Sequence, residues 1–186
     1  NMTIRAHKPE FNFREKLKEL DYSHVPYEKM PAGSVIQVKT LKESNNSHLT
    51  TTSSSWVTMN YEIDFYPKFA NSLILFQWSA PGQQPNTAVG ASDITVFRSI
   101  DDGTAINLGH SSHGFMMVGD FQEDGYVTAS GAFHGYDSPN TTSKVTYSIY
   151  GKTTSSGTAY IAHGSATRYF SVMEIRQSTS SLEDVS

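Results

Sequence analysis

The sequence predicts an all-β protein, a sandwich or a barrel, from three observations: one very regular strand, a series of short strands, and the composition. The regular strand follows a turn of Asp, Ser, Pro and Asn at residues 137–140. In this strand Val145, Tyr147 and Ile149 alternate with Lys144, Thr146 and Ser148. Alternation with a period of two is typical of a strand with one wet side and one dry side.

Short segments of the same kind fill most of the chain from residue 34 onward, separated by turns rich in Gly, Pro and Asn. The predicted strands are 35–41, 54–60, 61–66, 73–78, 93–100, 104–108, 126–133, 144–150, 158–162 and 169–176. The strand at 73–78 is apolar on both faces, which is typical of a strand covered on both sides. Asp101, Asp102 and Gly103 predict a tight hairpin. Such a series predicts two packed sheets or a barrel.

The composition supports this fold class and limits the chemistry. The chain has 186 residues, with ten Tyr, ten Phe and no Cys. Hydroxylic and aromatic residues favour strands and turns over helices. The absence of Cys excludes disulfides and thiolate metal sites. A net charge of −4 does not indicate a nucleic-acid partner.

Targeting signals are also missing from the sequence. No run approaches the ~18 apolar residues of a membrane-spanning helix, and the first residues lack the apolar core of a signal peptide. We therefore expect a soluble protein made inside a cell, with no membrane partner. The sequons at Asn1, Asn45 and Asn140 are then incidental in a chain rich in Ser and Thr.

The first 31 residues differ from the rest, and we call residues 1–31 the docking arm. Asn12 and Glu15 form a capping box that predicts a short helix over 12–20. Phe13, Leu17 and Leu20 share one face of that helix. An isolated helix of this length is marginal in water, so this stripe must lie on another protein or fold back on its own chain. The predicted sandwich then spans 32–177, and 178–186 form a flexible tail.

Two groups of side chains suggest metal or calcium sites, each with a simpler alternative. His110 and His113 could face a metal, but the surrounding Gly and Ser residues favour a solvated turn. Asp120, Glu123 and Asp124 could bind calcium, but their spacing lacks the alternating ligands of a dedicated loop and favours a polar hairpin. We therefore expect no cofactor.

Arg98 has the parity of the apolar residues beside it, so it is expected to point inward. A buried arginine needs a partner, and Glu174 on another enclosed strand is a candidate. Alternatively, a bulge turns Arg98 outward. Among the aromatic residues, Trp56 and Trp78 are expected to anchor packing, and Tyr136 and Tyr150 to lie on a contact surface.

The chain offers no sign of an enzyme. It has no Gly-x-Ser-x-Gly elbow, and no histidine is placed beside a nucleophile. Phosphate loops and dinucleotide fingerprints are also absent from the sequence.

Several short stretches, in order, resemble a module common in tailed bacteriophages, especially marine and cyanobacterial ones. They are Met30–Val38, Trp56–Thr58, Asn71–Leu75, Val96–Arg98, Gly103–Ile106, Asp137–Pro139, Thr142–Tyr147 and Ser171–Ile175. The resemblance covers about residues 30–176. It implies a jelly-roll β-sandwich similar to the trimeric heads of tumour necrosis factor and complement, found in phage fibre and virion-surface proteins.

Two departures from these relatives stand out. Fibre proteins usually have a long shaft ahead of the module. In addition, residues 109–118 differ from the short Gly-Asp-rich hairpin of many relatives, so an interface formed by that loop is in doubt.

The resemblance implies a non-enzymatic virion structural protein whose head forms a homotrimer and whose docking arm binds capsid or tail proteins. Residues expected in the subunit interface or core are Arg98, Val145, Tyr147, Ile149, Phe170 and Glu174. Capsid decoration is favoured over a tail-fibre tip because no shaft precedes the module. The alternative is a receptor-binding head whose loops at 43–52, 81–90 and 107–124 bind a host surface glycan or protein. A cellular signalling ligand of the same fold class is a third possibility, disfavoured by the missing signal peptide and cysteines.

Overall fold

The computed structural model describes residues 26–45, 47–86, 90–120, 129–154, 157–164 and 166–178. The chain divides into two compact units, residues 1–31 and 32–186. Within the described part of the first unit, the chain forms a single 3-10 turn, η1 (Tyr27–Lys29), directly after Pro26. The predicted helix at 12–20, with Phe13, Leu17 and Leu20, lies outside the described residues.

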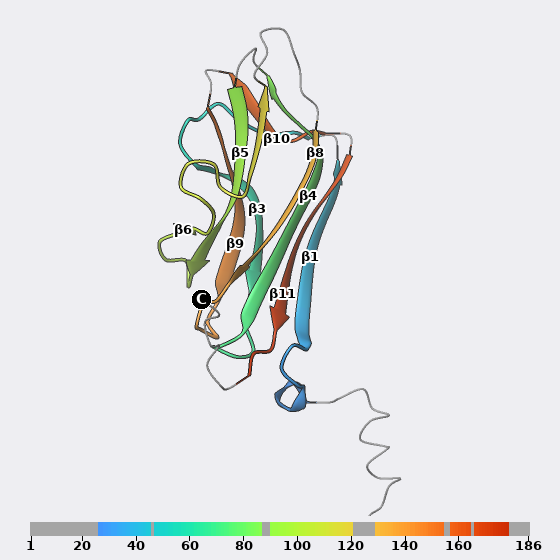
Figure 1. The fold of residues 1–186 in the computed structure, drawn as a ribbon, viewed down its shortest axis with the longest axis vertical. Helices are drawn as coiled ribbons and strands as arrows, with labels where there is room; N and C mark the ends of the chain where they lie inside the picture. Colours follow the sequence, from blue (N-terminus) through green and yellow to red (C-terminus); the bar gives the residue numbers. More distant parts are fainter. Residues whose placement is uncertain are drawn as a thin grey trace, which may run out of the picture. The chain divides into compact units, whose positions relative to one another are not determined.

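The second unit is built from strands (Figure 1). In chain order they are β1 (Val35–Asn45), β2 (Leu49–Thr51), β3 (Val57–Phe65), β4 (Leu73–Asn86), β5 (Gly90–Ile100), β6 (Ile106–Asn107), β7 (Met116–Asp120), β8 (Ala129–Asp137), β9 (Val145–Thr153), β10 (Thr158–Ala162) and β11 (Ala166–Ile175). No helix among the described residues has the length and apolar character needed to cross a bilayer.

The strands form two antiparallel sheets. In the first, β11 lies between β1 and β4, β8 pairs with β4, and β10 joins β4 to β2. In the second, β9 lies between β3 and β5, and both β6 and β7 pair with β5. The two sheets face each other, with neighbouring strands in the orders β1-β11-β4-β8 and β3-β9-β5-β7. This is the strand order of a jelly roll, in which two Greek keys form one sandwich. The predicted all-β jelly-roll sandwich is therefore confirmed, and its trimeric state stays a prediction.

The core lies between the two sheets and is formed by side chains that point inward from every second residue along the strands. The fully buried members include Phe65, Ile74, Phe76, Trp78, Ile94, Val96, Val145, Tyr147, Ile149, Phe170 and Val172. Each such side chain stabilises the fold by about 1.5–3 kcal/mol relative to an exposed one. The Trp78 ring packs edge-on against Tyr61 at 5.3 Å and Phe170 at 6.4 Å between ring centroids, so Trp78 does anchor the packing.

Several strand boundaries differ from the prediction, and two of the differences have a clear physical cause. The predicted strands 54–60 and 61–66 are one strand, β3, with an irregular register between Thr58 and Glu62. Asn60 lies there with a φ of 52°, and Asn adopts this left-handed conformation more readily than most residues. The chain also continues as β4 through Pro81 and Pro85, where a loop was predicted over 81–90. A register irregularity between Ala80 and Gln83 accommodates the prolines.

The hairpin after β5 agrees with its sequence signal. Asp101 and Asp102 both have positive φ, 48° and 57°, and the N–H of Gly103 donates to the carbonyl of Ile100 at 2.9 Å. This is the backbone geometry that matches the twist of two antiparallel strands. The strand that follows, β6, has two residues rather than the five predicted over 104–108.

Candidate functional surfaces

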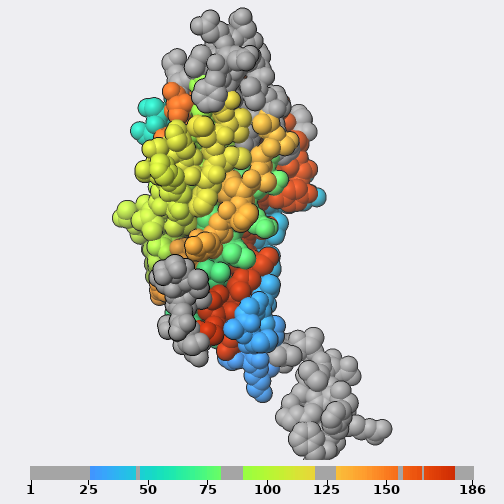
Figure 2. Space-filling view, viewed as in Figure 1, coloured from blue at the N-terminus to red at the C-terminus, as the bar shows by residue number. Residues whose placement is uncertain are grey.

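The outer surface of the first sheet has a continuous row of apolar side chains, which we call the apolar face. Val38 of β1 lies beside Met173 of β11, Met173 beside Leu75 of β4, and Leu75 beside Tyr136 of β8. Val38 is 49% exposed and Tyr136 is 71% exposed, whereas Met173 and Leu75 are half-buried. Figure 2 shows the surface of this sheet, with β8 in orange, β4 in green, β11 in red and β1 in blue side by side.

A second apolar pair and a shallow hollow flank the row. Ile175 and Leu73 lie side by side on one flank and are half-buried. The hollow, of about 390 Å³, is lined on the other flank by Ser79, Ala132 and Tyr169 among others. The small side chains of Ser79 and Ala132 leave the hollow open beside the Tyr169 ring. The apolar face therefore combines exposed hydrophobic side chains with an adjoining hollow, which is typical of a surface that binds another protein.

The sequence missed this row but contained a signal for it. The segment Leu73–Trp78 was predicted to be covered on both sides because both of its faces are apolar. The core covers Ile74, Phe76 and Trp78, but the described residues leave Leu73 and Leu75 only half-buried. One side of β4 thus lacks the cover that its sequence predicts.

The outer surface of the second sheet is polar. Thr146 of β9 donates a hydrogen bond from its hydroxyl to the Asp64 carboxylate at 2.6 Å, and Ser148 donates to Glu62 at 3.0 Å. Both hydroxyl residues are 8% exposed, while both carboxylates, on β3, are exposed. These four side chains line a groove of about 300 Å³ that runs beside β9, and we call it the β9 groove.

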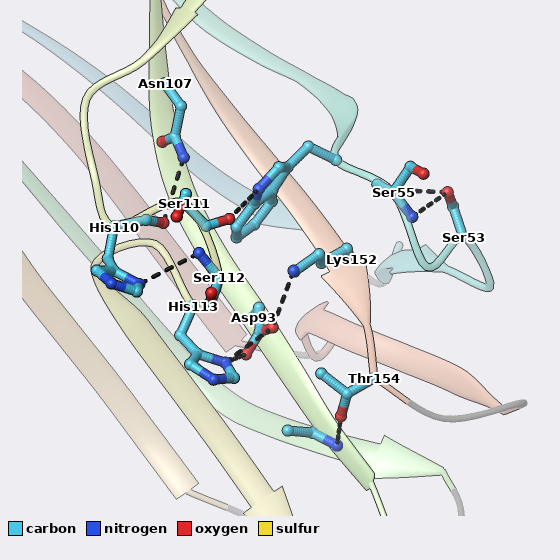
Figure 3. Close-up of polar contacts among 12 residues, drawn as sticks. Ser53, Ser55, Asp93, Asn107, His110, Ser111, Ser112, His113, Lys152 and Thr154 are labelled. Carbon is cyan, nitrogen blue, oxygen red and sulfur yellow. Dashed lines mark hydrogen bonds and ion pairs between the residues drawn. The ribbon is translucent and has the colours of Figure 1, made fainter.

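Farther along the same face, a buried carboxylate holds down the turn between β6 and β7. Asp93 is fully buried, and its carboxylate contacts Nδ1 of His113 at 3.2 Å and Nζ of Lys152 at 3.7 Å (Figure 3). The turn also requires Gly114, whose φ is +64° and whose position directly against Ile94 leaves no room for a Cβ atom. Asp93 therefore clamps this turn onto β5 and β9.

A tryptophan completes the same clamp. The ring of Trp56 lies 4.8 Å from Nζ of Lys152, and its indole N–H donates to the carbonyl of Ser111 at 3.2 Å. Trp56 is half-buried and packs edge-on against Phe97. The expected packing role of Trp56 is thus played at the surface, under a turn.

The two histidines of the metal hypothesis have separate local roles. Nδ1 of His110 accepts the backbone N–H of Ser112 at 3.2 Å, and His113 bonds to Asp93 (Figure 3). Within the described ranges, no group of three or more His, Asp or Glu side chains could hold a metal ion. Glu123 and Asp124 of the calcium hypothesis lie outside the described residues, and the side chain of Asp120 is not described.

Arg98 points inward, and no bulge displaces it, because the register of β5 with β9 runs unbroken from Thr95 to Ile100. Its partner is Asp137 of β8, whose oxygens lie 2.9 and 3.1 Å from Nη1 of Arg98. The Tyr147 hydroxyl donates to the same carboxylate at 2.9 Å. Burial, and then the Asp137 charge, raise the pKa of Tyr147. The predicted pairing of Arg98 with Glu174 is therefore wrong, because Asp137 at the end of β8 lies against Arg98 and Glu174 has other partners.

Glu174 is fully buried and holds the β3–β4 connection instead. Its carboxylate accepts the backbone N–H groups of Lys68 and Phe69 at 2.8–3.1 Å and the hydroxyl of Ser72 at 2.6 Å. Gln37 donates a further bond at 2.7 Å. A buried carboxylate can be stabilised by such neutral donors without an arginine.

A second buried arginine joins the sheets on the other side of the core. Arg168 of β11, 2% exposed, donates from Nε to the Glu43 carboxylate at 2.7 Å. Its guanidinium lies 5.5 Å from the centroid of the Tyr61 ring on β3. Burial, and then the charge of Glu43, raise the pKa of Tyr61 to about 12. Sequence parity alone did not single out this cluster.

Most residues proposed for the subunit interface or core lie inside one chain. Val145, Tyr147, Ile149 and Phe170 are fully buried between the sheets, so they cannot touch a sister copy. The two tyrosines that were expected on a contact surface lie in different places. Tyr136 lies on the apolar face, while Tyr150 is half-buried and stacks on Phe97 at 4.0 Å between centroids.

Comparisons with known proteins give likenesses in structure but none in sequence. No family model matches the chain, and no curated protein matches it in sequence. A solved chain from the structure of infectious bursal disease virus, Gx strain, is similar with a TM-score of 0.34 and 11% identity. The match covers 80% of this chain and 38% of the viral chain.

Proposed function

We propose that this chain is a non-enzymatic structural protein of a virion, a trimeric jelly-roll head attached to the particle through its docking arm. The observation behind the proposal is the apolar face. The core covers the inner side of β4, while Leu73 and Leu75 on its outer side are only half-buried in a single chain, and a second copy of the same protein supplies a surface that covers them.

Burial of the apolar face provides the driving force for assembly. Removing apolar surface from water stabilises an assembly by roughly 25 cal/mol per Å². The row Val38, Met173, Leu75 and Tyr136 crosses four neighbouring strands of the six-stranded sheet, so a partner would enclose a patch on β1, β11, β4 and β8. Closed rotational symmetry lets each copy bury the same patch, which prevents open-ended association. The number three comes from the resemblance of residues 30–176 to trimeric phage modules.

The docking arm is proposed to bind the particle. Its predicted stripe, Phe13, Leu17 and Leu20, offers an apolar contact, and the positive charge of residues 1–20 contrasts with the acidic remainder. Three arms on one trimer gain avidity, because each further contact becomes intramolecular once the first has formed. The same arrangement suits capsid decoration or a short fibre.

Decoration of particles tests this proposal. Particles that lack the protein are mixed with the full chain or with a chain lacking residues 2–31, and then imaged by electron microscopy. We expect the full chain to add density at one repeated position, and the shortened chain to stay trimeric but unbound. Decoration by the shortened chain would contradict the docking role, and the position of the density distinguishes capsid from tail.

A further inference from the structure

The β9 groove has a defined shape on the face opposite the apolar face. Thr146 and Ser148 form its floor, because these short side chains leave a trough between longer neighbours. Glu62 and Asp64 of β3 form one wall. The hairpin residues Asp102, Gly103 and Ala105 form the other wall. The trough is thus bounded by elements that the jelly roll itself holds in place.

The groove is rich in hydrogen-bond acceptors. The hydroxyl protons of Thr146 and Ser148 are used on Asp64 and Glu62, so these hydroxyls present lone pairs to a ligand. An ionised carboxylate accepts hydrogen bonds and donates none, and it has sites for more than one donor. A ligand that fits this chemistry must bring its own donors, as the hydroxyl groups of a sugar do.

An aromatic pair closes one end of the groove. Tyr150 lines it and stacks on Phe97, with 24° between the ring planes. Both rings are half-buried, so the pair is held firmly. Aromatic rings of this kind provide apolar surface at low entropic cost, with a polar hydroxyl at the edge.

The charges in the groove select among ligands. Glu62, Asp64 and Asp102 supply three carboxylates, and the ammonium group of Lys144 is already paired with Asp102. The excess negative charge repels acidic sugars and phosphate groups. An uncharged sugar avoids this repulsion and still supplies several hydroxyl donors.

We propose that the β9 groove binds an uncharged pyranose of a surface glycan. The hydroxyl groups of the sugar donate to Glu62 and Asp64, and the C–H groups on one side of the sugar ring pack against Tyr150. This site differs from the loops that the sequence suggested for receptor recognition. It lies on the sheet opposite the apolar face, so it can fail or succeed independently of trimerisation.

Saturation-transfer NMR with the full chain tests the proposal directly. The probes are methyl pyranosides of glucose, galactose, mannose and N-acetylglucosamine, with N-acetylneuraminic acid as the acidic comparison. We expect saturable binding of at least one methyl pyranoside and none of the acidic sugar. Absence of binding by all four pyranosides, or equal binding of the acidic sugar, would overturn the assignment.

Variants then place the bound sugar. Hydrogen bonds to charged groups contribute about 1.5–3 kcal/mol, so Asp64→Asn should weaken binding by about tenfold or more. Tyr150→Ala should weaken it as well, while the matched control Tyr136→Ala, on the apolar face, should leave it unchanged. Circular dichroism confirms that each variant is folded. Equal affinities for Tyr150→Ala and Tyr136→Ala would rule the site out.

Discussion

The two outer faces of this sandwich are built by the same strand alternation yet have opposite chemistry. On the first sheet, Val38, Met173, Leu75 and Tyr136 form an apolar row that water contacts directly. On the second, hydroxyl groups of β9 pair with carboxylates of β3, and a clamped turn covers Asp93. The polar groups of the second face are hydrogen-bonded while exposed to water, whereas moving the apolar side chains of the first face out of water is favourable.

This difference indicates that the faces have different tasks. A polar face with a groove suits a small, hydrophilic ligand that binds reversibly. An apolar face that crosses four neighbouring strands suits permanent contact with another protein. The contrast depends on both sheets keeping their present orientation, which the buried charges between them enforce.

The largest effect is expected from breaking that connection. Asp137 on the first sheet binds Arg98 and Tyr147 on the second. Asp137→Ala leaves a largely buried guanidinium without its carboxylate, which should lower the free energy of unfolding by about 3–5 kcal/mol. Urea denaturation measures this loss.

The matched control for this variant is an exposed ion pair. Asp102, 76% exposed, pairs with Lys144 and has a positive φ that Asn also tolerates, so Asp102→Asn should leave the free energy of unfolding almost unchanged. Similar losses in the two variants would show that the Arg98–Asp137 pair does not hold the sheets together.

A charge placed on each face should separate their roles. Tyr136→Asp on the apolar face puts a carboxylate into the proposed subunit interface, where an unpaired buried charge is strongly unfavourable. Ile106→Asp alters a residue on β6 of the second sheet that is 44% exposed. We expect Tyr136→Asp to reduce the molar mass in solution to that of one chain and Ile106→Asp to leave it unchanged, as measured by light scattering. The reverse result would assign the interface to the second sheet.

The smallest effect is a loss of stability in alkali. The folded pKa of Tyr61 is raised to about 12 from 10.0 because the phenol is buried beside Glu43. The pKa of Tyr147 is raised as well. A raised pKa means that the folded state favours the neutral phenol. The corresponding stability is complete below pH 10 and falls as the pH rises toward and beyond 12.

The variant Tyr61→Phe has no phenol to ionise at that position, so its stability should fall less steeply above pH 10. Unfolding by guanidinium at a series of pH values measures both slopes. Parallel slopes for the two proteins would contradict the assignment of part of the alkaline loss to Tyr61.

Much of the fold could be predicted because local patterns determine it. The alternation around Tyr147, the hairpin signal at Asp101–Gly103 and the inward parity of Arg98 each follow from neighbouring residues and agree with the structure. The pairing of Arg98 with Asp137 could not be predicted, because it depends on which strands the jelly roll places opposite each other. The continuation of β4 through Pro81 and Pro85 was missed because prolines usually end strands.

The candidate surfaces were harder to foresee for the same reason. The row from Val38 to Tyr136 combines single residues from four strands, and only their register aligns them. The β9 groove similarly depends on the register of β3 with β9, which sets Asp64 beside Thr146 and Glu62 beside Ser148. A sequence gives the parity of each strand, but the contacts across strands come from the fold.

The mass of the intact protein in solution tests the central claim most directly, that sister copies cover the apolar face. Sedimentation equilibrium at micromolar concentration should give three times the chain mass of 20.6 kDa. A single species of 20.6 kDa under the same conditions would contradict the account.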